Sequence, residues 1–345
     1  MKSCRSEIPA PPSREEWLFL KELQQPEQRC LHWDRTNCEA PPQHLDLNPG
    51  LSLEVDFPDP EGLLETAFED FRKLLTFAEL PENGSVPCRF QQEDSGGSES
   101  FHLRINADGI TLSATDREGL RRGIYFLENQ LTGATIPALP FTDQRREPWL
   151  RNRISRCFFG PIKRPPFNRD ELLDDMDYYP DEYLNRLAHE GINGLWLTVV
   201  FRELAQTSFT KRDPLAEKRL EKLRKTVAQC RRYGIKTWLF SIEPRNLALK
   251  DPLLLENPEF GGASAYDGNL CFCPSSEKGR QYLHESTFDI FSRVPNLGGL
   301  INISHGERAT SCLSSVAATD DSPVQCPRCS QIPKWQIHHY TVDAM

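Results

Sequence analysis

A group of ionisable residues follows an apolar stretch near residue 300 and could carry out acid–base chemistry. The apolar run 300–303 is typical of a strand covered on both faces in a parallel α/β sheet, and His305, Glu307 and Arg308 come directly after it. A carboxyl group at such a strand end can act as a general acid, and the basic residues can hold a polar substrate. We therefore expect Glu307 to be catalytic, with His305 and Arg308 contacting the substrate. An ordinary charged surface turn would have the same composition.

Alternating strands and helices are expected before this group. Apolar runs that suit strands occupy residues 154–159, 195–201, 235–242 and 297–303. Helical periodicity separates them, and such alternation is typical of an α/β protein in which helices connect the parallel strands of a barrel. Four βα units fit in residues 148–345, whereas an eight-stranded TIM-type barrel needs about 250 residues. We therefore predict a partial (β/α)8 barrel there, in a chain that stops near the middle of that domain.

A different pattern occupies residues 49–147. Residues 51–57 alternate as in a half-buried strand, and residues 64–75 have helical spacing between two prolines. The segment 101–114 has two alternating runs around an Asp-Gly turn, and Asp116 is placed to cap a following helix. This order predicts a small α+β domain. We expect its core to contain Phe68, Phe71, Leu103, Leu112, Leu120 and Leu127.

Residues 101–131 also resemble a known protein family. The run FHLRINADGITLSATDREGLRRGIYFLENQL is similar to the non-catalytic domain that precedes the barrel in β-N-acetylhexosaminidases of glycoside hydrolase family 20. The resemblance implies a glycosidase, an O-glycosyl hydrolase that releases terminal N-acetylated amino sugars by acid catalysis. In that family the substrate's own 2-acetamido group is the nucleophile. Any α+β unit with a hairpin and a helix would share part of this order.

The resemblance implies roles for individual residues at the strand ends. In the family the fourth strand ends in His-x-Gly-Gly-Asp-Glu, where Glu is the general acid and Asp orients the acetamido group. Glu307 takes the place of the acid, but Gly306 stands where the family has Asp. Arg156 resembles the arginine that holds sugar hydroxyls, although an ordinary ion pair would explain it equally. Glu243 is placed like the acidic residue of the family's Pro-Glu-Ile-Asp segment, with the order Glu-Pro here.

Three cysteines near the end of the chain are candidate metal ligands. Cys326 and Cys329 form a CxxC pair, with Cys312 upstream and His338 or His339 downstream, and such a set could hold structural zinc. The ligand spacing matches no standard zinc finger. We therefore predict free thiols, no metal site and no cofactor.

The remaining cysteines and the N-terminal segment indicate the cellular compartment of the protein. Cys271 and Cys273 precede a helix cap and are expected to serve loop packing. Eleven cysteines without regular spacing suit reduced thiols, and no apolar segment follows the basic start, so we expect a cytoplasmic protein. A lost N-terminal signal would instead make it secreted. Residues 1–48, rich in Pro, Gln, Glu and Arg, are expected to be loosely structured.

The charge and apolar content limit the partners. The net charge of -9 over 345 residues argues against nucleic acid or an anionic membrane as the main partner. No apolar run of about 18 residues occurs, so no transmembrane helix is expected. The expected partner is a carbohydrate substrate, an amino sugar or a glycan, and no pattern predicts an oligomeric state.

Two functions of different classes follow. The first is a glycoside hydrolase resembling β-N-acetylhexosaminidases, with Glu307 as its acid. The second is a catalytically inactive or truncated fragment that acts as a carbohydrate-binding or assembly module, which the absence of the orienting Asp favours.

Overall fold

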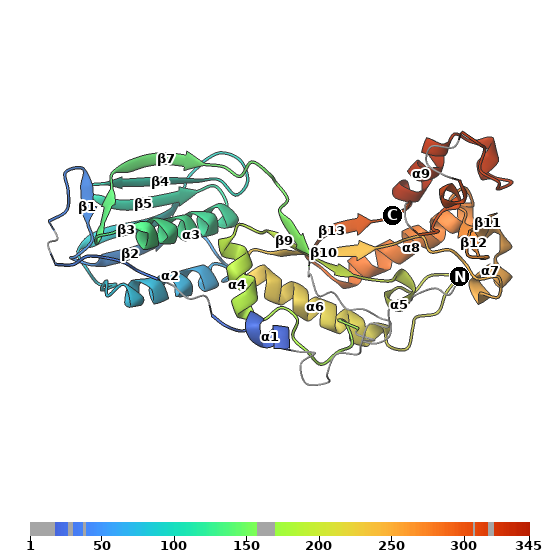
Figure 1. Ribbon diagram of the computed structural model, residues 1–345, viewed down its shortest axis with the longest axis horizontal. Helices are drawn as coiled ribbons and strands as arrows, with labels where there is room; N and C mark the ends of the chain where they lie inside the picture. The colour runs from blue at the N-terminus through green and yellow to red at the C-terminus, as the bar shows by residue number, and fades with distance from the viewer. Residues whose placement is uncertain (1–17, 27–29, 37–38, 157–169, 306–307, 317–320) are drawn as a thin grey trace, which may run out of the picture. The chain divides into compact units, whose positions relative to one another are not determined.

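The protein is described by a computed structural model in which the chain divides into two compact units (Figure 1). The first unit comprises residues 1–155, 177–194 and 228–235, and the second comprises 156–176, 195–227 and 236–345. The structure describes residues 18–26, 30–36, 39–156, 170–305, 308–316 and 321–345.

The first unit contains a five-stranded sheet in the order β2-β3-β5-β4-β7. The strands are β2 (Leu51–Asp56), β3 (Val86–Gln92), β4 (Phe101–Asn106), β5 (Gly109–Ala114) and β7 (Thr142–Arg146). β2, β3 and β5 pair in parallel, while β4 is antiparallel to both β5 and β7. The β4–β5 hairpin turns at Gly109, whose φ of +125° favours glycine and where a Cβ would lie 2.4 Å from the Pro87 carbonyl oxygen. The predicted hairpin is confirmed.

Two helices cover one face of this sheet. They are α2 (Glu65–Phe77) and α3 (Arg117–Gly133), which lie side by side in Figure 1. The six residues expected in the core are all at most 7% exposed. Gly123 brings α3 close to β5, because a Cβ there would lie 2.5 Å from a Leu112 methyl carbon. The apolar spacing of the helices and the alternation of the strands therefore meet in one core.

Four shorter elements also belong to the first unit. The strand β1 (His44–Asp46) pairs antiparallel with β6 (Ala138–Pro140), and the helices α1 (Leu18–Leu23) and α4 (Asp181–His189) lie outside the sheet. Leu45 and Leu47 beside β1 are buried, although no strand was expected there. The reason is tertiary, since β1 has its partner almost a hundred residues further along the chain.

The second unit contains a four-stranded sheet. Its sheet has the order β13-β10-β9-β8, with β8 (Ile154–Arg156), which the division between the units crosses, β9 (Gly194–Thr198), β10 (Lys236–Ser241) and β13 (Leu297–Asn302). β10 and β13 pair in parallel. The chain between them includes α8 (Glu277–Arg293), and α6 (Ala216–Arg232) precedes β10. The described chain therefore has a mixed α/β fold, as the alternation predicts.

The structure corrects two expectations for these strands. β9 ends at Thr198 and a short helix, α5 (Phe201–Leu204), occupies the end of the run predicted as one strand. β13 was expected to be covered on both faces, but each of its residues is half-buried. The physical reason is its place at the end of the sheet order, with β10 on one side. Its two glycines make room for Trp238, because a Cβ on either would lie about 2.5 Å from the indole ring.

A smaller subdomain follows β10. It contains α7 (Pro252–Glu256), the antiparallel pair β11 (Gly261–Ser264) and β12 (Leu270–Phe272), and α9 (Lys334–Asp343). Three 3-10 turns, η1 (Pro258–Phe260), η2 (Cys312–Ser315) and η3 (Cys329–Gln331), connect these elements. The β11–β12 hairpin was not anticipated, since its strands are too short to give a clear alternation.

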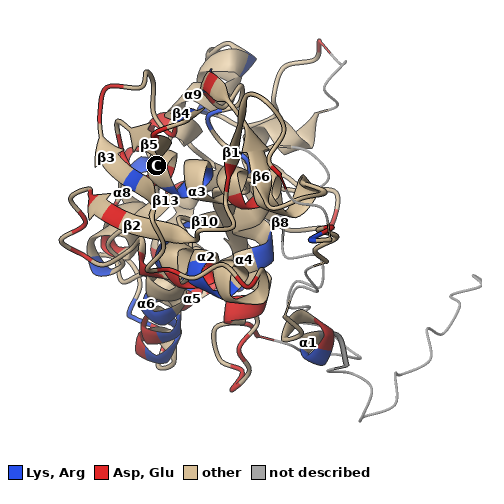
Figure 2. Cartoon of the chain, turned by 90° about the vertical axis from the view of Figure 1, so that its left-hand side faces the viewer, with Lys and Arg blue, Asp and Glu red and all other residues tan. Residues whose placement is uncertain are grey.

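Acidic and basic residues share the same surface elements. Figure 2 shows Lys and Arg beside Asp and Glu on α6 and on α1. Among the residues that the structure describes, no helix has the length and apolar character that crossing a bilayer requires.

Candidate functional site

The edge of the second unit's sheet where β10 and β13 end carries a group of polar side chains. Because the two strands are parallel and Ser241 pairs with Asn302, the residues that follow them emerge at the same edge. We define the strand-end cluster as Arg202, Glu243, Tyr282 and Asn302. In parallel α/β folds this edge is where substrates bind.

Glu243 is the buried acid of the cluster. The residue is 3% exposed, and its two side-chain oxygens accept hydrogen bonds from the backbone N–H groups of Phe201 and Arg245, both at 3.1 Å. The Arg245 guanidinium lies 3.7 Å away. Burial raises the pKa of Glu243 above its ordinary value, and the two backbone hydrogen bonds and Arg245 only partly oppose that rise. Glu243 therefore joins the segment after β9 to the segment after β10.

Asn302 holds this turn from the neighbouring strand. Its Oδ1 accepts hydrogen bonds from Ser241 Oγ at 2.6 Å and from the Glu243 backbone N–H at 3.0 Å. Its Nδ2 donates to the Glu243 carbonyl oxygen at 2.7 Å. The side chain of Asn302 thus fixes the direction in which the chain leaves β10.

Arg202 and Tyr282 complete the cluster on the side of α5 and α8. Arg202 Nη1 donates to Asp251 Oδ2 at 2.6 Å, and the Arg202 guanidinium also interacts electrostatically with Tyr282. Burial, followed by the charge of Glu243, raises the pKa of Tyr282 to about 12. Burial by itself lowers the pKa of Arg202, but its interactions with Asp251 and Tyr282 leave that pKa raised overall. The guanidinium is therefore held charged beside the buried acid.

A cavity with both polar and apolar walls adjoins Arg202 and Asp251 in the second unit. Its volume is about 670 Å³, and its walls are the segment after α5 and the start of α7. Hydroxyl, amide and charged groups line much of it, and they include those of Gln206, Thr207, Ser208, Thr210, Lys211, Arg212 and Asp213. Such groups can donate to and accept from a ligand that carries several hydroxyls.

The structure describes some of the predicted site residues and not others. Glu307 lies outside the described residues, and so does the side chain of Arg156, the last residue of β8. His305 is half-buried and Arg308 is exposed. Among the predicted residues, Glu243 is the one that the structure brings into the strand-end cluster. Arg202, Tyr282 and Asn302 were not among the predicted site residues, and only Asn302 has a signal in the sequence, as a polar residue that ends an apolar strand.

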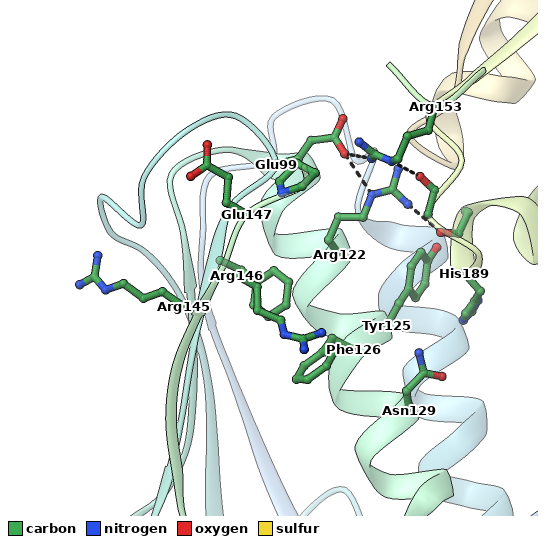
Figure 3. Close-up of a pocket in the computed structure, with 14 residues that line it drawn as sticks. Glu99, Arg122, Tyr125, Phe126, Asn129, Arg145, Arg146, Glu147, Arg153 and His189 are labelled. Carbon is green, nitrogen blue, oxygen red and sulfur yellow. Dashed lines mark hydrogen bonds and ion pairs between the residues drawn. The ribbon is translucent and has the colours of Figure 1, made fainter. Parts of the chain in front are cut away.

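A second cavity, of about 540 Å³, lies within the first unit (Figure 3). Glu99 bridges two arginines at its edge, with Arg122 Nε at 3.2 Å and a closer contact to Arg153. Asn193 Nδ2 donates to the other Glu99 oxygen at 2.6 Å. Burial would raise the pKa of Glu99, but the Asn193 hydrogen bond and the two arginines hold it below its ordinary value.

The charged groups of this second cavity are bound to other parts of the unit. Arg122 also donates to the Ala188 carbonyl oxygen at 2.7 Å, which ties α3 to the end of α4. His189 Nε2 lies 2.8 Å from a Glu128 oxygen and 3.1 Å from an Asp70 oxygen. Figure 3 shows Arg145 pointing away from the Glu99 and Arg122 pair. These contacts suit a structural role, since they hold helices of one unit together.

Comparisons with known proteins relate the fold to glycoside hydrolases. No family model and no curated protein matches the chain. A GH138 enzyme targeting pectin rhamnogalacturonan II matches with a TM-score of 0.53 and 14% identity, over 73% of this chain and 30% of that one. The GH20 exo-β-N-acetylglucosaminidase of Vibrio harveyi matches with a TM-score of 0.44 and 14% identity, over 73% and 43% of the two chains. The β-N-acetylhexosaminidase of Bacteroides fragilis gives 0.44 and 13%, over 73% and 52%.

These likenesses concern the fold. At 14% identity the match to the GH138 enzyme shows a glycoside hydrolase-like fold and nothing about the reaction. The chain spans about a third to a half of the length of these solved structures.

Proposed function

We propose that the chain is a glycoside hydrolase resembling β-N-acetylhexosaminidases, with its active site at the strand-end cluster and Glu307 as general acid. The observation that carries the proposal is the cavity that Arg202 lines, because Arg202 also belongs to the strand-end cluster through its interaction with Glu243. The glycoside hydrolase-like fold supports the reaction class. The amino-sugar substrate rests on the resemblance of residues 101–131 to the family and on the position of Glu307 after β13.

The reaction assigns different tasks to the two carboxyl groups. Glu307 donates its proton to the departing glycosidic oxygen, while the acetamido oxygen of the substrate attacks the anomeric carbon. Glu243 is a positioning residue, because backbone N–H groups occupy both of its oxygens. Arg202 faces the cavity and is placed to contact sugar hydroxyls, as are His305, Arg308 and Arg156 in this proposal.

Replacing Glu307 tests the assignment. Glu307→Gln keeps the size of the side chain but cannot supply the proton, so the rate on an aryl N-acetylglucosaminide should fall by about a hundredfold to ten-thousandfold. The melting temperature should equal that of the control variant Glu221→Gln. Glu221 is an exposed residue of α6 that pairs with Lys225. A lowered melting temperature with an unchanged rate would show that Glu307 is structural. The assay includes any longer natural form of the protein, because the matches cover only 30–52% of those enzymes.

A non-catalytic carbohydrate-binding or assembly module is the alternative, and Gly306 in place of the orienting Asp favours it. In that case the wild-type chain binds N-acetylglucosamine in calorimetry but releases no product from the aryl glycoside. Glu307→Gln then leaves the affinity unchanged.

A further inference from the structure

Four cysteines that are far apart in the sequence meet in the second unit. Cys273 follows β12, Cys312 begins η2, Cys326 precedes η3 by three residues, and Cys329 begins η3. Their sulfur atoms all lie within 4.8 Å of one another, and each residue is at most 2% exposed. Cys273 was expected to serve loop packing. It instead completes the ligand set that the CxxC pair and Cys312 lacked in the sequence.

The spacing of the sulfur atoms suits a tetrahedral metal centre. Cys273 Sγ lies 3.7 Å from Cys326 Sγ and 3.6 Å from Cys329 Sγ. A disulfide would need about 2.05 Å, and all four residues are free cysteines. Four sulfurs at about 2.3 Å from a zinc ion stand about 3.8 Å apart, so the observed spacing is that of zinc ligands.

Polar groups around the cysteines suit thiolates. Arg328 Nε donates to Cys273 Sγ at 3.2 Å, and its Nη2 is held by the Gly261 carbonyl oxygen at 2.6 Å. Ser275 Oγ lies 3.2 Å from Cys329 Sγ. Four thiolates around a divalent ion leave a net negative charge, which Arg328 partly balances. Hydrogen-bond donors to the ligands also fix the orientation of the ligands around a metal ion.

The backbone and apolar side chains close the site. Gly262 of β11 lies against the sulfurs, since a Cβ there would be 2.1 Å from Cys312 Sγ and 3.3 Å from Cys326 Sγ. An apolar shell surrounds the cysteines and comprises Ala263, Ala265, Ala309, Leu313, Val324 and Ile337. All four ligand positions are thus filled by protein, as in structural sites, and catalytic zinc sites instead keep a position open.

We propose that Cys273, Cys312, Cys326 and Cys329 bind one structural zinc ion. On binding, the four thiols lose their protons to the solvent and each sulfur forms one bond to the metal. This site is separate from the proposed active site and does not depend on the proposed reaction.

The zinc ion joins the segment after β13 to the β11–β12 hairpin. This segment reaches from residue 303 to 333, and η2 and η3 are the regular structure in its described part. Its backbone contacts the hairpin through Phe272 N–H, which donates to the Thr310 carbonyl oxygen at 2.9 Å. Thr310 Oγ1 in turn donates to the Ser304 carbonyl oxygen at 2.6 Å. The metal therefore fixes the segment that leaves the strand end, where His305 and Arg308 lie.

Elemental analysis of the purified full chain tests the site. We expect about one zinc per wild-type chain, and loss of that zinc in Cys326→Ser and in Cys329→Ser. Cys271→Ser is the matched control, because Cys271 is equally buried and two residues from Cys273 but does not belong to the group of four. It should keep its zinc. Loss of zinc from Cys271→Ser as well would overturn the ligand assignment.

A measurement on the wild type covers the case in which the serine variants do not fold. Native mass spectrometry should detect the mass of one zinc ion, and a strong zinc chelator should remove it and lower the melting temperature. Added zinc should restore both. Two results would overturn the proposal. One is a metal-free chain in which the four thiols form disulfides or react freely with an alkylating reagent. The other is a bound iron ion in place of zinc. None of these readouts requires the chain to be active.

Discussion

At the scale of single residues, Glu243 shows how burial and local donors act against each other on one carboxyl group. The side chain is almost fully buried, which favours its protonated form, while two backbone N–H groups and Arg245 favour the carboxylate. Burial is the larger effect, so the pKa of Glu243 is raised. The folded protein therefore binds this proton more tightly than the unfolded chain does.

The raised pKa predicts how the stability of Glu243→Gln depends on pH. The contribution of Glu243 is fully present below its unfolded pKa, near the ordinary value of 4.5, and declines as the pH rises through the folded pKa. The free energy of unfolding of the wild type should thus fall relative to Glu243→Gln across that range and then level off. The amide of Gln has one acceptor oxygen where the carboxylate of Glu has two, so one of the two backbone hydrogen bonds is lost. This loss lowers the free energy of unfolding of Glu243→Gln by about 1 kcal/mol at every pH. Denaturant unfolding over a pH series measures it.

The exposed variant Glu221→Gln supplies the baseline for this series. A difference between wild type and Glu243→Gln that stays constant with pH, or that grows in favour of the wild type, would contradict the raised pKa.

At the scale of elements, the start of α3 is specified by its cap. Asp116 has extended backbone angles and its Oδ1 accepts a hydrogen bond from the Gly119 N–H at 2.7 Å, as the sequence predicts. Its Oδ2 also accepts from the Glu99 N–H at 3.1 Å and from Ser98 Oγ at 3.0 Å. One carboxylate thus begins the helix and holds the loop before β4.

Removing this cap should destabilise the first unit. Asp116→Ala leaves the N–H groups of Gly119 and Glu99 without their acceptor, so the free energy of unfolding should fall by about 1–2 kcal/mol. Asp116→Asn keeps an acceptor oxygen and should lose much less. Chemical denaturation of both variants makes the comparison, and equal losses for Ala and Asn would show that the charge, not the cap, is what matters.

At the scale of the whole molecule, each unit gathers stretches that are separate in the chain. The first unit takes residues 177–194 and 228–235 in addition to its main part, and the second takes the segments between and after them. The exposed connection after β7 carries Trp149, which is 98% exposed, whereas Tyr125 of α3 is 2% exposed. Accessibility to a protease should therefore differ sharply between these two aromatic residues.

Limited proteolysis with chymotrypsin should cut after Trp149 well before it cuts within residues 51–133. The expected reason is that the protease needs locally unfolded backbone, and the core of the first unit opens only when the sheet and helices separate. Mass spectrometry of the fragments over time gives the order of cutting. Cleavage after Tyr125 as early as after Trp149 would mean that the first unit is not a stable core.

Local patterns determined much of the first unit from the sequence. The alternation in residues 101–114, the Asp-Gly turn and the Asp116 cap concern residues within a few positions of one another, and each predicted feature is present. The helical spacing of residues 64–75 likewise predicts the buried face of α2. Periodicity and capping act along the chain, which is why they can be read without a structure.

Contacts between distant residues were decided only by the tertiary structure. Cys273 and Cys312 carry no common spacing signal, yet they meet in one buried group because the segment after β13 folds back onto β12. Arg202 and Glu243 likewise follow two different strands, and Asn302 is the last residue of a third. Nothing in the pattern of one strand states which polar residues its neighbours carry at their ends. The sequence by itself indicated where the longer helices and the strands with clear patterns form. The pairing of those elements decided which side chains share a site, because sites are made from long-range contacts that leave no periodic trace in the chain.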